Sequence, residues 1–219
     1  MFSMNETDSL QSQAYNIIKE KILTKAFDAG VLYSETRLAR ELGISRTPLR
    51  EALQCLSQDG YITIIPSRGF KIRQLDQNTM RESIHVRCAI EGFCLHLAAS
   101  REEERRFQKL LKDMEKSLER QRAALDSPHF PDAFVEEDHQ FHLLLVHYAK
   151  NSEFDHLFQR LLYMIHLTTL NALAIPGRAK TTYEEHTALC RHLREGNADM
   201  AYQVLMEHLM MPLKMDLVQ

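Results

Sequence analysis

The spacing of apolar residues predicts helices along most of the chain, with one short interruption. Between residues 10 and 58 apolar side chains recur every three or four positions, which predicts three helices, at about 10–28, 34–42 and 46–58. From 61 to 73, β-branched and aromatic residues on both sides of a Pro-Ser-Arg-Gly turn predict a β-hairpin. Three helices followed by a hairpin are the element order of a winged helix-turn-helix.

Beyond residue 75 helical spacing returns and continues almost to the end of the chain. Six antiparallel helices joined by short loops form a bundle, and bundle cores commonly hold ligands or metals. The fold class is therefore mainly α, with an N-terminal winged helix-turn-helix domain over residues 1–74 and a C-terminal all-α antiparallel helical bundle over residues 75–219. The six helices of the bundle are expected at about 76–99, 102–124, 132–148, 152–173, 179–194 and 198–214.

Residues 42–53 have the pattern of the turn and second helix of a helix-turn-helix. Gly43 supplies a left-handed turn, and the apolar residues after it recur at helical spacing and form a buried face. Arg46, Thr47 and Arg50 stay off that face, near the end of the helix that a recognition helix presents to the major groove. Taken alone, the stretch fits an amphipathic helix with solvated arginines equally well.

The predicted hairpin and the distribution of charge favour DNA binding. The hairpin tip, Ser67-Arg68-Gly69, has small residues that let the backbone approach a phosphate or the minor groove closely. Residues 1–74 hold ten Lys and Arg against eight Asp and Glu, a charge of +2, whereas the remainder holds 17 against 22, a charge of −5. The net charge of −3 argues against a protein that coats nucleic acid, so we expect affinity for DNA to come from local arginines and from dimerisation.

Neither a membrane segment nor a secretion signal is expected. No stretch approaches the ~20 consecutive apolar residues of a membrane helix, and polar residues interrupt the apolar positions near Met1. The four cysteines form no Cys-x-x-Cys pair, which is typical of thiols in a reducing cytosol. We therefore expect a cytoplasmic protein with no membrane partner.

Four residues of the bundle form a candidate metal site. Asp138 and His142 are four residues apart, on one face of a helix. His186 and His208 lie at nearly equal distances from the turn between the last two helices, so they reach similar heights. Any one of these histidines alone is better explained as an ordinary core or surface residue. Together they need a shared partner, because an unpaired buried polar group costs ~1–3 kcal/mol. Carboxylate and imidazole ligands suit zinc first, with nickel, manganese and iron as alternatives.

The charge of such a site favours an anionic effector. Three neutral imidazoles and one carboxylate around a divalent ion leave a charge of roughly +1. Arg87 lies one turn from Glu91 on a partly apolar face, and its guanidinium is a fork for a carboxylate. The alternative is an Arg87–Glu91 ion pair on the outside of the bundle. Thr168, Thr169 and Asn171 are polar positions in an apolar helix, and we expect Arg87, Glu91, Thr168 and Asn171 to line the effector site.

Several stretches of the N-terminal domain form a recognisable pattern: Ser34-Glu35, Leu38-Ala39, the segment 42–53, Leu56, Gly60 and Arg68-Gly69-Phe70. With this pattern, roughly residues 10–74 resemble the GntR family of bacterial transcription regulators. The resemblance implies DNA contacts from Arg46, Thr47, Arg50, Arg68 and Gly69. Some members have arginine at the position of Thr36, and here the adjacent Arg37 is the candidate for that contact.

A second set of residues lies in the helical bundle: Arg87, Glu91, Asp138, His142, Asn151, Glu185, His186, Ala201, His208 and Leu209. With these residues, about 80–212 resembles the FCD domain of the FadR-type branch of that family, in its shorter, six-helix type. The resemblance implies that Asp138, His142, His186 and His208 bind a metal, and that the effector is a small organic acid.

These features predict a ligand-responsive bacterial transcription regulator, a repressor that binds a near-palindromic double-stranded operator as a homodimer. A second hypothesis is a metal-dependent hydrolase or oxygenase with an accessory helix-turn-helix domain. Against it, Glu137 and Glu185 adjoin metal-ligand positions on helices that should turn them away, so no general base is evident. A third is a regulator whose metal is purely structural.

Overall fold

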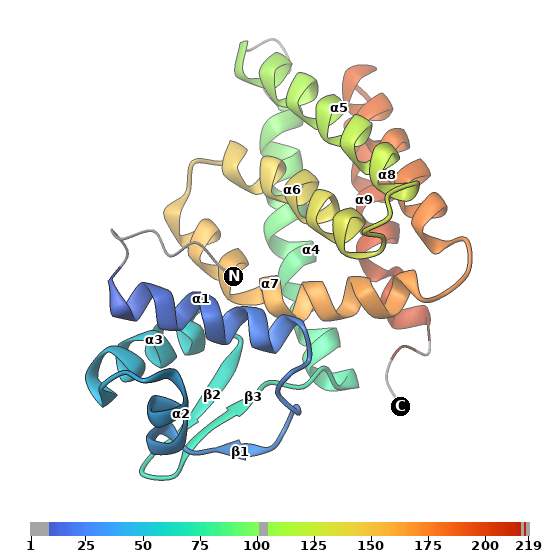
Figure 1. Ribbon diagram of the computed structural model, residues 1–219. Helices are drawn as coiled ribbons and strands as arrows, with labels where there is room; N and C mark the ends of the chain where they lie inside the picture. Colours follow the sequence, from blue (N-terminus) through green and yellow to red (C-terminus); the bar gives the residue numbers. More distant parts are fainter. Residues whose placement is uncertain (1–8, 101–104, 216, 218–219) are drawn as a thin grey trace. The chain divides into compact units, whose positions relative to one another are not determined.

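The chain folds into two compact units, residues 1–74 and 75–219 (Figure 1). A computed structural model describes residues 9–100, 105–215 and 217. Within the described residues, no helix has the length and apolar character that a bilayer crossing requires.

From residue 9 onward, where the structure describes it, the first unit contains three helices and a small antiparallel sheet. Strand β3 lies in the middle, with β2 on one side and β1 on the other. The predicted helices and hairpin are present, whereas the two-residue strand β1 was not predicted. The elements are α1 (Leu10–Leu23), β1 (Leu32–Tyr33), α2 (Glu35–Leu42), α3 (Arg46–Gln58), β2 (Ile62–Ile65) and β3 (Gly69–Ile72).

Helix α1 ends earlier than the sequence pattern predicts. It stops at Leu23, because Thr24 takes the C-cap position and Lys25 adopts a left-handed backbone with φ of 57°. The chain then turns so that Phe27 packs edge-on against Tyr33 of β1, with ring centroids 4.9 Å apart. Phe27, which falls within the predicted helix, therefore packs with the sheet instead.

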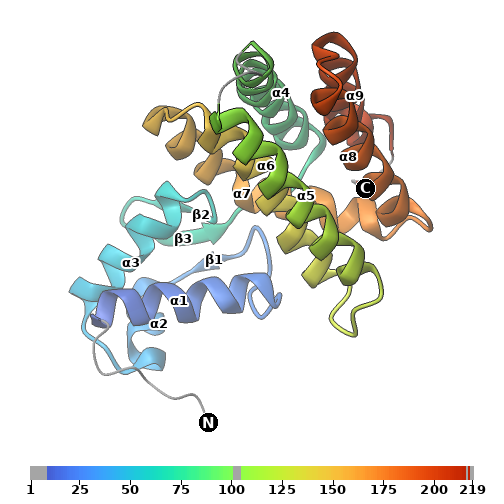
Figure 2. The same cartoon turned by 90° about the horizontal axis from the view of Figure 1, so that it is seen from above.

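The core of this unit holds the helix-turn-helix in place. Helix α1 packs across α3 (Figure 2), and Ile18 of α1 is fully buried. Leu49, Leu53 and Leu56 are at most 1% exposed, as the helical spacing predicts. Gly43 ends α2 in the left-handed conformation, φ 68°, and starts the turn into α3.

The second unit is an all-helical bundle. Its predicted helices agree with the structure to within a few residues at each end, but residues 101–104, which include the predicted start at Glu102, lie outside the described part. The last helix ends at Met210 rather than at 214, and the chain continues as a 3₁₀ turn at Pro212, which cannot donate a backbone hydrogen bond. The elements are α4 (Gln77–Ala99), α5 (Arg105–Leu125), α6 (Asp132–Tyr148), α7 (Ser152–Leu173), α8 (Arg178–Arg194), α9 (Ala198–Met210) and η1 (Met211–Lys214).

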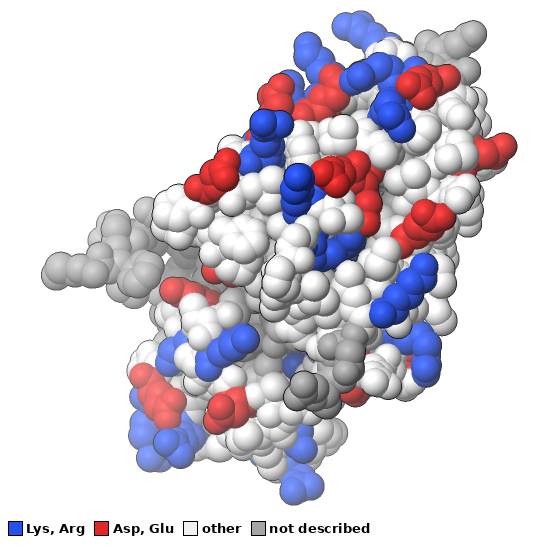
Figure 3. All heavy atoms as spheres, turned by 90° about the vertical axis from the view of Figure 1, so that its right-hand side faces the viewer, with Lys and Arg blue, Asp and Glu red and all other residues white. Residues whose placement is uncertain are grey.

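Helix α4 is central to this bundle and packs against α6, α7 and α9. Helices α8 and α9 form an antiparallel hairpin, and α5 covers α6 and α8. On the face drawn in Figure 3, basic and acidic side chains are interspersed, in keeping with the small net charge. The packing directs one face of α6, α8 and α9 toward a common point inside the bundle.

Candidate metal centre and nucleic-acid interface

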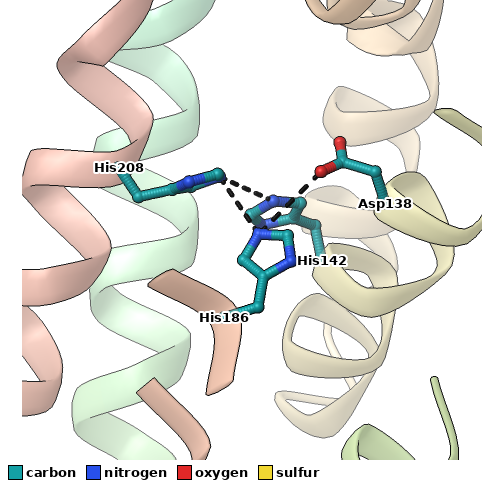
Figure 4. Close-up of side chains that lie close together, drawn as sticks. All are labelled: Asp138, His142, His186 and His208. Atoms are coloured by element: carbon teal, nitrogen blue, oxygen red, sulfur yellow. Dashed lines mark hydrogen bonds and ion pairs between the residues drawn. The ribbon is translucent and has the colours of Figure 1, made fainter. Parts of the chain in front are cut away.

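Three histidines and one aspartate converge inside the bundle. Asp138 and His142 come from α6, His186 from α8 and His208 from α9 (Figure 4). One ligand atom from each lies within 4.8 Å of the others, and all four residues are buried. The Nε2 atom of His208 lies 3.2 Å from the Nε2 atoms of both His142 and His186. The structure thus brings together the four residues that the sequence singled out.

Each of these histidines is held through its other ring nitrogen. Nδ1 of His142 lies 2.6 Å from Glu91 on α4, and Nδ1 of His208 lies 2.7 Å from Glu185 on α8. Nδ1 of His186 lies 2.8 Å from the side-chain oxygen of Gln121 on α5. The two carboxylates and the amide oxygen accept hydrogen bonds from Nδ1–H, which leaves an Nε2 lone pair on each ring.

The two outer carboxylates are neutralised by arginines. Arg87 Nε donates to Glu91 at 2.8 Å, and both Nη groups of Arg178 donate to Glu185 at 2.7 Å. Burial raises the pKa of Glu185, but its hydrogen bonds with His208 and Arg178 outweigh burial and lower that pKa to about 2. This outer layer therefore adds no net charge to the four converging residues.

Burial determines the charge state of the inner residues. It lowers the pKa values of His142 and His186 well below the usual range, so both rings are neutral at pH 7. Burial also raises the pKa of Asp138. In the Nδ1–H form the Nε2 lone pair of His208 faces those of His142 and His186 at 3.2 Å, an arrangement that a shared cation stabilises.

The spacing of these donor atoms fits a single metal ion. Nitrogen and oxygen ligands lie about 2.0–2.2 Å from zinc, so pairs of ligands around one ion are about 3–4 Å apart. The Nε2–Nε2 distances of 3.2 Å and the 3.9 Å between Asp138 Oδ1 and His186 Nε2 agree with this range. The donor set and its hydrogen-bonded surroundings therefore suit a divalent metal.

A small cavity of about 30 Å³ lies next to the cluster, bordered by Asp138 and His208. Arg87 and Thr168 line it, and Nη2 of Arg87 is buried without a hydrogen-bond partner in the described chain. The other lining residues are Thr169, Ala172, Leu173, Arg178, Thr182, Leu209 and Pro212.

Two predicted effector residues do not line this cavity. Glu91 is fully buried between Arg87 and His142, so the Arg87–Glu91 ion pair lies inside the bundle rather than outside. Asn171 is exposed and donates to the carbonyl of Leu217. An apolar helix with a few polar positions does not by itself reveal which of them face inward.

Three site residues were missed. Glu185 was expected to turn away from the site, and it does turn away from its neighbour His186, but it reaches His208 on the next helix. Arg178 shares its helix face with Glu185, so the seven-residue spacing was an available signal. Nothing near Gln121 in the sequence marks it, because its contact with His186 spans 65 residues.

In the first unit, a polar hollow of about 210 Å³ brings together Arg46, Arg50, Arg68 and Gly69. Ser34, Glu35, Thr36 and Ser67 complete its lining. Thr47 is exposed beside it on α3 but does not line it. Arg37 lines a different hollow and pairs with Glu41 on its own helix at 2.9 Å. Ser45, at the N-cap of α3, makes no side-chain capping bond.

Gly69 has a structural role in this unit. Its φ is 131°, and a Cβ at this position would lie 2.0 Å from the carbonyl oxygen of Tyr33 on β1. Glycine is therefore required for β3 to pair with β1, independently of any approach to DNA.

Comparison with known proteins decides the family. The model of the FCD domain matches residues 82–210, and the model of bacterial regulatory proteins of the gntR family matches residues 10–72. The chain belongs to the GntR family and carries an FCD domain.

Similar sequences and similar solved structures support the assignment of this chain to the GntR family. It is 27% identical to the HTH-type transcriptional regulator YdhC of Bacillus subtilis over 207 residues, which cover 94% of this chain and 91% of YdhC. It is 32% identical to the HTH-type transcriptional repressor RspR of Escherichia coli over 146 residues, 67% of this chain and 62% of RspR. A GntR transcriptional regulator from Rhodococcus sp. RHA1 has the same fold, with a TM-score of 0.71 at 18% identity over 94% of this chain and 97% of that one.

The family assignment selects among the hypotheses. The chain is a DNA-binding transcription regulator, and the hydrolase or oxygenase hypothesis is discarded because this family and these relatives are regulators rather than enzymes. GntR-type regulators bind DNA through the N-terminal unit and take up small-molecule effectors through the FCD domain.

Proposed function

We propose that this regulator is a homodimeric cytoplasmic repressor that responds to a small organic acid through a metal-containing pocket. The convergence of three Nε2 lone pairs and one carboxylate in the FCD domain is the observation that carries the proposal. A bacterial DNA-binding protein works in the cytoplasm, where its operator is. The repressor role is supported by the likeness to RspR.

For DNA, we assign direct base contacts to Arg46 and Arg50. Both are exposed near the N-terminus of α3, and within the described residues neither has a partner on its Nη groups. Arg and guanine pair through two hydrogen bonds in the major groove, with ~1–3 kcal/mol of discrimination for each good pair. Thr47, Arg68 and the backbone at Gly69 serve as further contacts. Arg37, which pairs with Glu41, is assigned a phosphate contact from the second helix.

For the metal, Asp138, His142, His186 and His208 are the proposed ligands. Zinc suits this nitrogen-rich set first, and nickel, manganese and iron are the alternatives that the experiment below distinguishes. A bound divalent ion would give the buried site a charge of roughly +1 and so attract an anion. Glu91, Glu185 and Gln121 keep the Nε2 atoms turned inward.

For the effector, the free Nη2 of Arg87 is the proposed carboxylate partner. It is buried, lacks a partner in the described chain, and borders the same cavity as Asp138 and His208. The threonines Thr168 and Thr182 add hydroxyl groups for a polar effector. The cavity has room for about two water molecules, which is close to the size of one carboxylate group.

For the dimer, an exposed apolar face of α4 and α7 is the proposed interface. Val86 and Phe93 lie seven residues apart on α4 and are 37% and 53% exposed. Phe93 packs edge-on against Phe154 of α7, and Leu157 on the same helix is 42% exposed. A face that exposes several large apolar side chains is typical of a protein interface. A twofold dimer gives two recognition helices for a near-palindromic operator.

The experiment begins with elemental analysis of full-length protein purified without chelator. We expect one divalent ion per chain, with loss of that ion in His186→Ala. A panel of small carboxylates is then tested on loaded and chelator-treated protein against operator DNA obtained by selection from random duplexes. One of them should raise the melting temperature and release DNA only when the protein is loaded.

Different results overturn different parts of this proposal. Protein without metal contradicts the ligand set, and a loaded protein that responds to no carboxylate leaves a purely structural metal. Binding that tightens rather than loosens with the effector contradicts release of the operator. If Arg46→Ala with Arg50→Ala leaves operator affinity unchanged, the DNA contacts are wrong.

A further inference from the structure

The hollow on the first unit contains one carboxylate among three arginines. Of the side chains that line it, Glu35 is acidic and Arg46, Arg50 and Arg68 are basic. A carboxylate on a surface that meets DNA repels the phosphates and lowers affinity for any sequence. Glu35 therefore does not serve general affinity for DNA, and another role has to explain its position in this hollow.

Glu35 contacts one of these arginines directly. Its Oε2 accepts a hydrogen bond from Nε of Arg50 at 2.8 Å, across the turn between α2 and α3. The Glu35 side chain is 21% exposed, whereas that of Arg50 is 64% exposed. The carboxylate is thus partly sheltered from water, and the guanidinium extends from it toward the solvent.

The contact leaves the outer edge of the guanidinium available. Nε is engaged, and in the described residues Nη1 and Nη2 of Arg50 have no hydrogen-bond partner. Those two groups form the planar fork that binds O6 and N7 of guanine. An arginine whose orientation is fixed before binding loses less side-chain entropy when it forms such a pair.

We infer that Glu35 is a positioning residue, which orients Arg50 so that it discriminates guanine at one operator position. Glu35 lowers overall affinity for DNA and raises the difference in affinity between the correct base and the other three. The inference rests on the proposed base contact of Arg50.

A neighbouring ion pair supplies a matched control. Glu41 lies on the same helix and pairs with Arg37 rather than with a proposed base-reading residue, and its side chain is 47% exposed. Glu35→Gln and Glu41→Gln each remove one negative charge from α2. Only Glu35→Gln removes the carboxylate that holds Arg50.

The experiment compares full-length wild-type protein, Glu35→Gln and Glu41→Gln in selection from a random duplex library, followed by affinity measurements on single-base variants of the selected operator. Both variants should bind unrelated duplex DNA several-fold more tightly. At the base read by Arg50, which is identified with Arg50→Ala, Glu35→Gln should lose about tenfold in discrimination. Glu41→Gln should keep the wild-type ratio.

A second variant distinguishes a loss of discrimination from a change in folding. Arg50→Lys keeps the positive charge and lacks the Nε–H, so it should lose discrimination at the same base, and adding Glu35→Gln to it should cause no further loss. Wild-type discrimination in Glu35→Gln, or equal effects of the two glutamate substitutions at that base, overturns the inference. An unchanged motif in Arg50→Ala overturns the proposed contact itself and the inference with it.

Discussion

Glu91 and His142 form a fully buried polar contact beside the proposed metal ligands of the FCD domain. Oε2 of Glu91 lies 2.6 Å from Nδ1 of His142, and the two side chains are 0% and 1% exposed. Burial raises the pKa of Glu91, whereas the ion pair with Arg87 opposes that effect. A carboxylate that accepts from Nδ1–H fixes the ring orientation and makes Nε2 a stronger ligand.

The first prediction is that Glu91→Gln weakens metal binding without removing a ligand. An amide accepts a weaker hydrogen bond than a carboxylate, so the dissociation constant for zinc should rise about 10–100-fold. Competition with a chromophoric chelator measures this constant. Glu82→Gln, on an exposed turn of the same helix, is the control and should leave it unchanged. Equal constants for Glu91→Gln and wild type would contradict the positioning role.

Much of the bundle could be predicted because its evidence is local. Helix boundaries follow from spacing and breakers within a few residues, and the matching heights of His186 and His208 follow from a short hairpin. Contacts that join distant helices could not be predicted in the same way. The Gln121–His186 pair depends on how α5 lies over α8, which no local pattern records.

The hydrophobic pattern also did not predict two details of the first unit. Strand β1 has only two residues, Leu32 and Tyr33, too few for an alternating pattern to be recognised. Glycine at a hairpin tip fits a close approach to DNA, but the pattern does not show that Gly69 also lies against the backbone of Tyr33. Both details depend on pairing between segments that are far apart in sequence.

The second prediction concerns pH and His139. Burial lowers the pKa of His139 from 6.5 to about 3, so the folded chain keeps this ring neutral while the unfolded chain takes up a proton below pH 6.5. The free energy of unfolding should therefore fall by about 1.4 kcal/mol per pH unit below that value for this one group. Between pH 7.5 and pH 5, His139 accounts for a loss of about 2 kcal/mol in the free energy of unfolding.

Urea unfolding of chelator-treated protein measures this effect. His139→Phe removes the titrating group. Unfolding of this variant should therefore take up about one proton fewer near pH 5, and its unfolding free energy should depend less steeply on pH. His147→Phe is the control, because that side chain is 59% exposed. If His139→Phe and wild type lose stability in parallel between pH 7.5 and pH 5, His139 does not stay neutral in the folded state.

The third prediction tests the proposed dimer interface. Phe93→Glu places a charge on the exposed apolar face of α4, where it would have to be desolvated on association. Sedimentation should show a shift from dimer to monomer, and affinity for a two-site operator should fall toward that of a single site. Met200→Glu, on α9 at 39% exposure, should remain dimeric. A dimeric Phe93→Glu would place the interface elsewhere.

The fourth prediction compares two glycines that both have positive φ. Gly43→Ala adds a Cβ that meets nothing within 4 Å, so its cost is the left-handed backbone alone, about 1 kcal/mol. Gly69→Ala adds a Cβ at 2.0 Å from the Tyr33 carbonyl, an impossible distance, at a φ of 131°. The strand pairing of β1 and β3 must therefore open, which we expect to cost about 3 kcal/mol or more from strain and lost hydrogen bonds.

Urea unfolding followed by circular dichroism separates these two costs, provided that the transition of residues 1–74 is resolved from that of the bundle. Gly69→Ala should lower the midpoint of the first unit well below that of Gly43→Ala and leave the bundle's transition in place, because the affected contact lies within the first unit. Equal midpoints for the two variants would mean that the hairpin moves away from β1 at little cost. In that case the requirement for glycine at position 69 would lie in the approach to DNA, and operator affinity, rather than stability, would fall in Gly69→Ala.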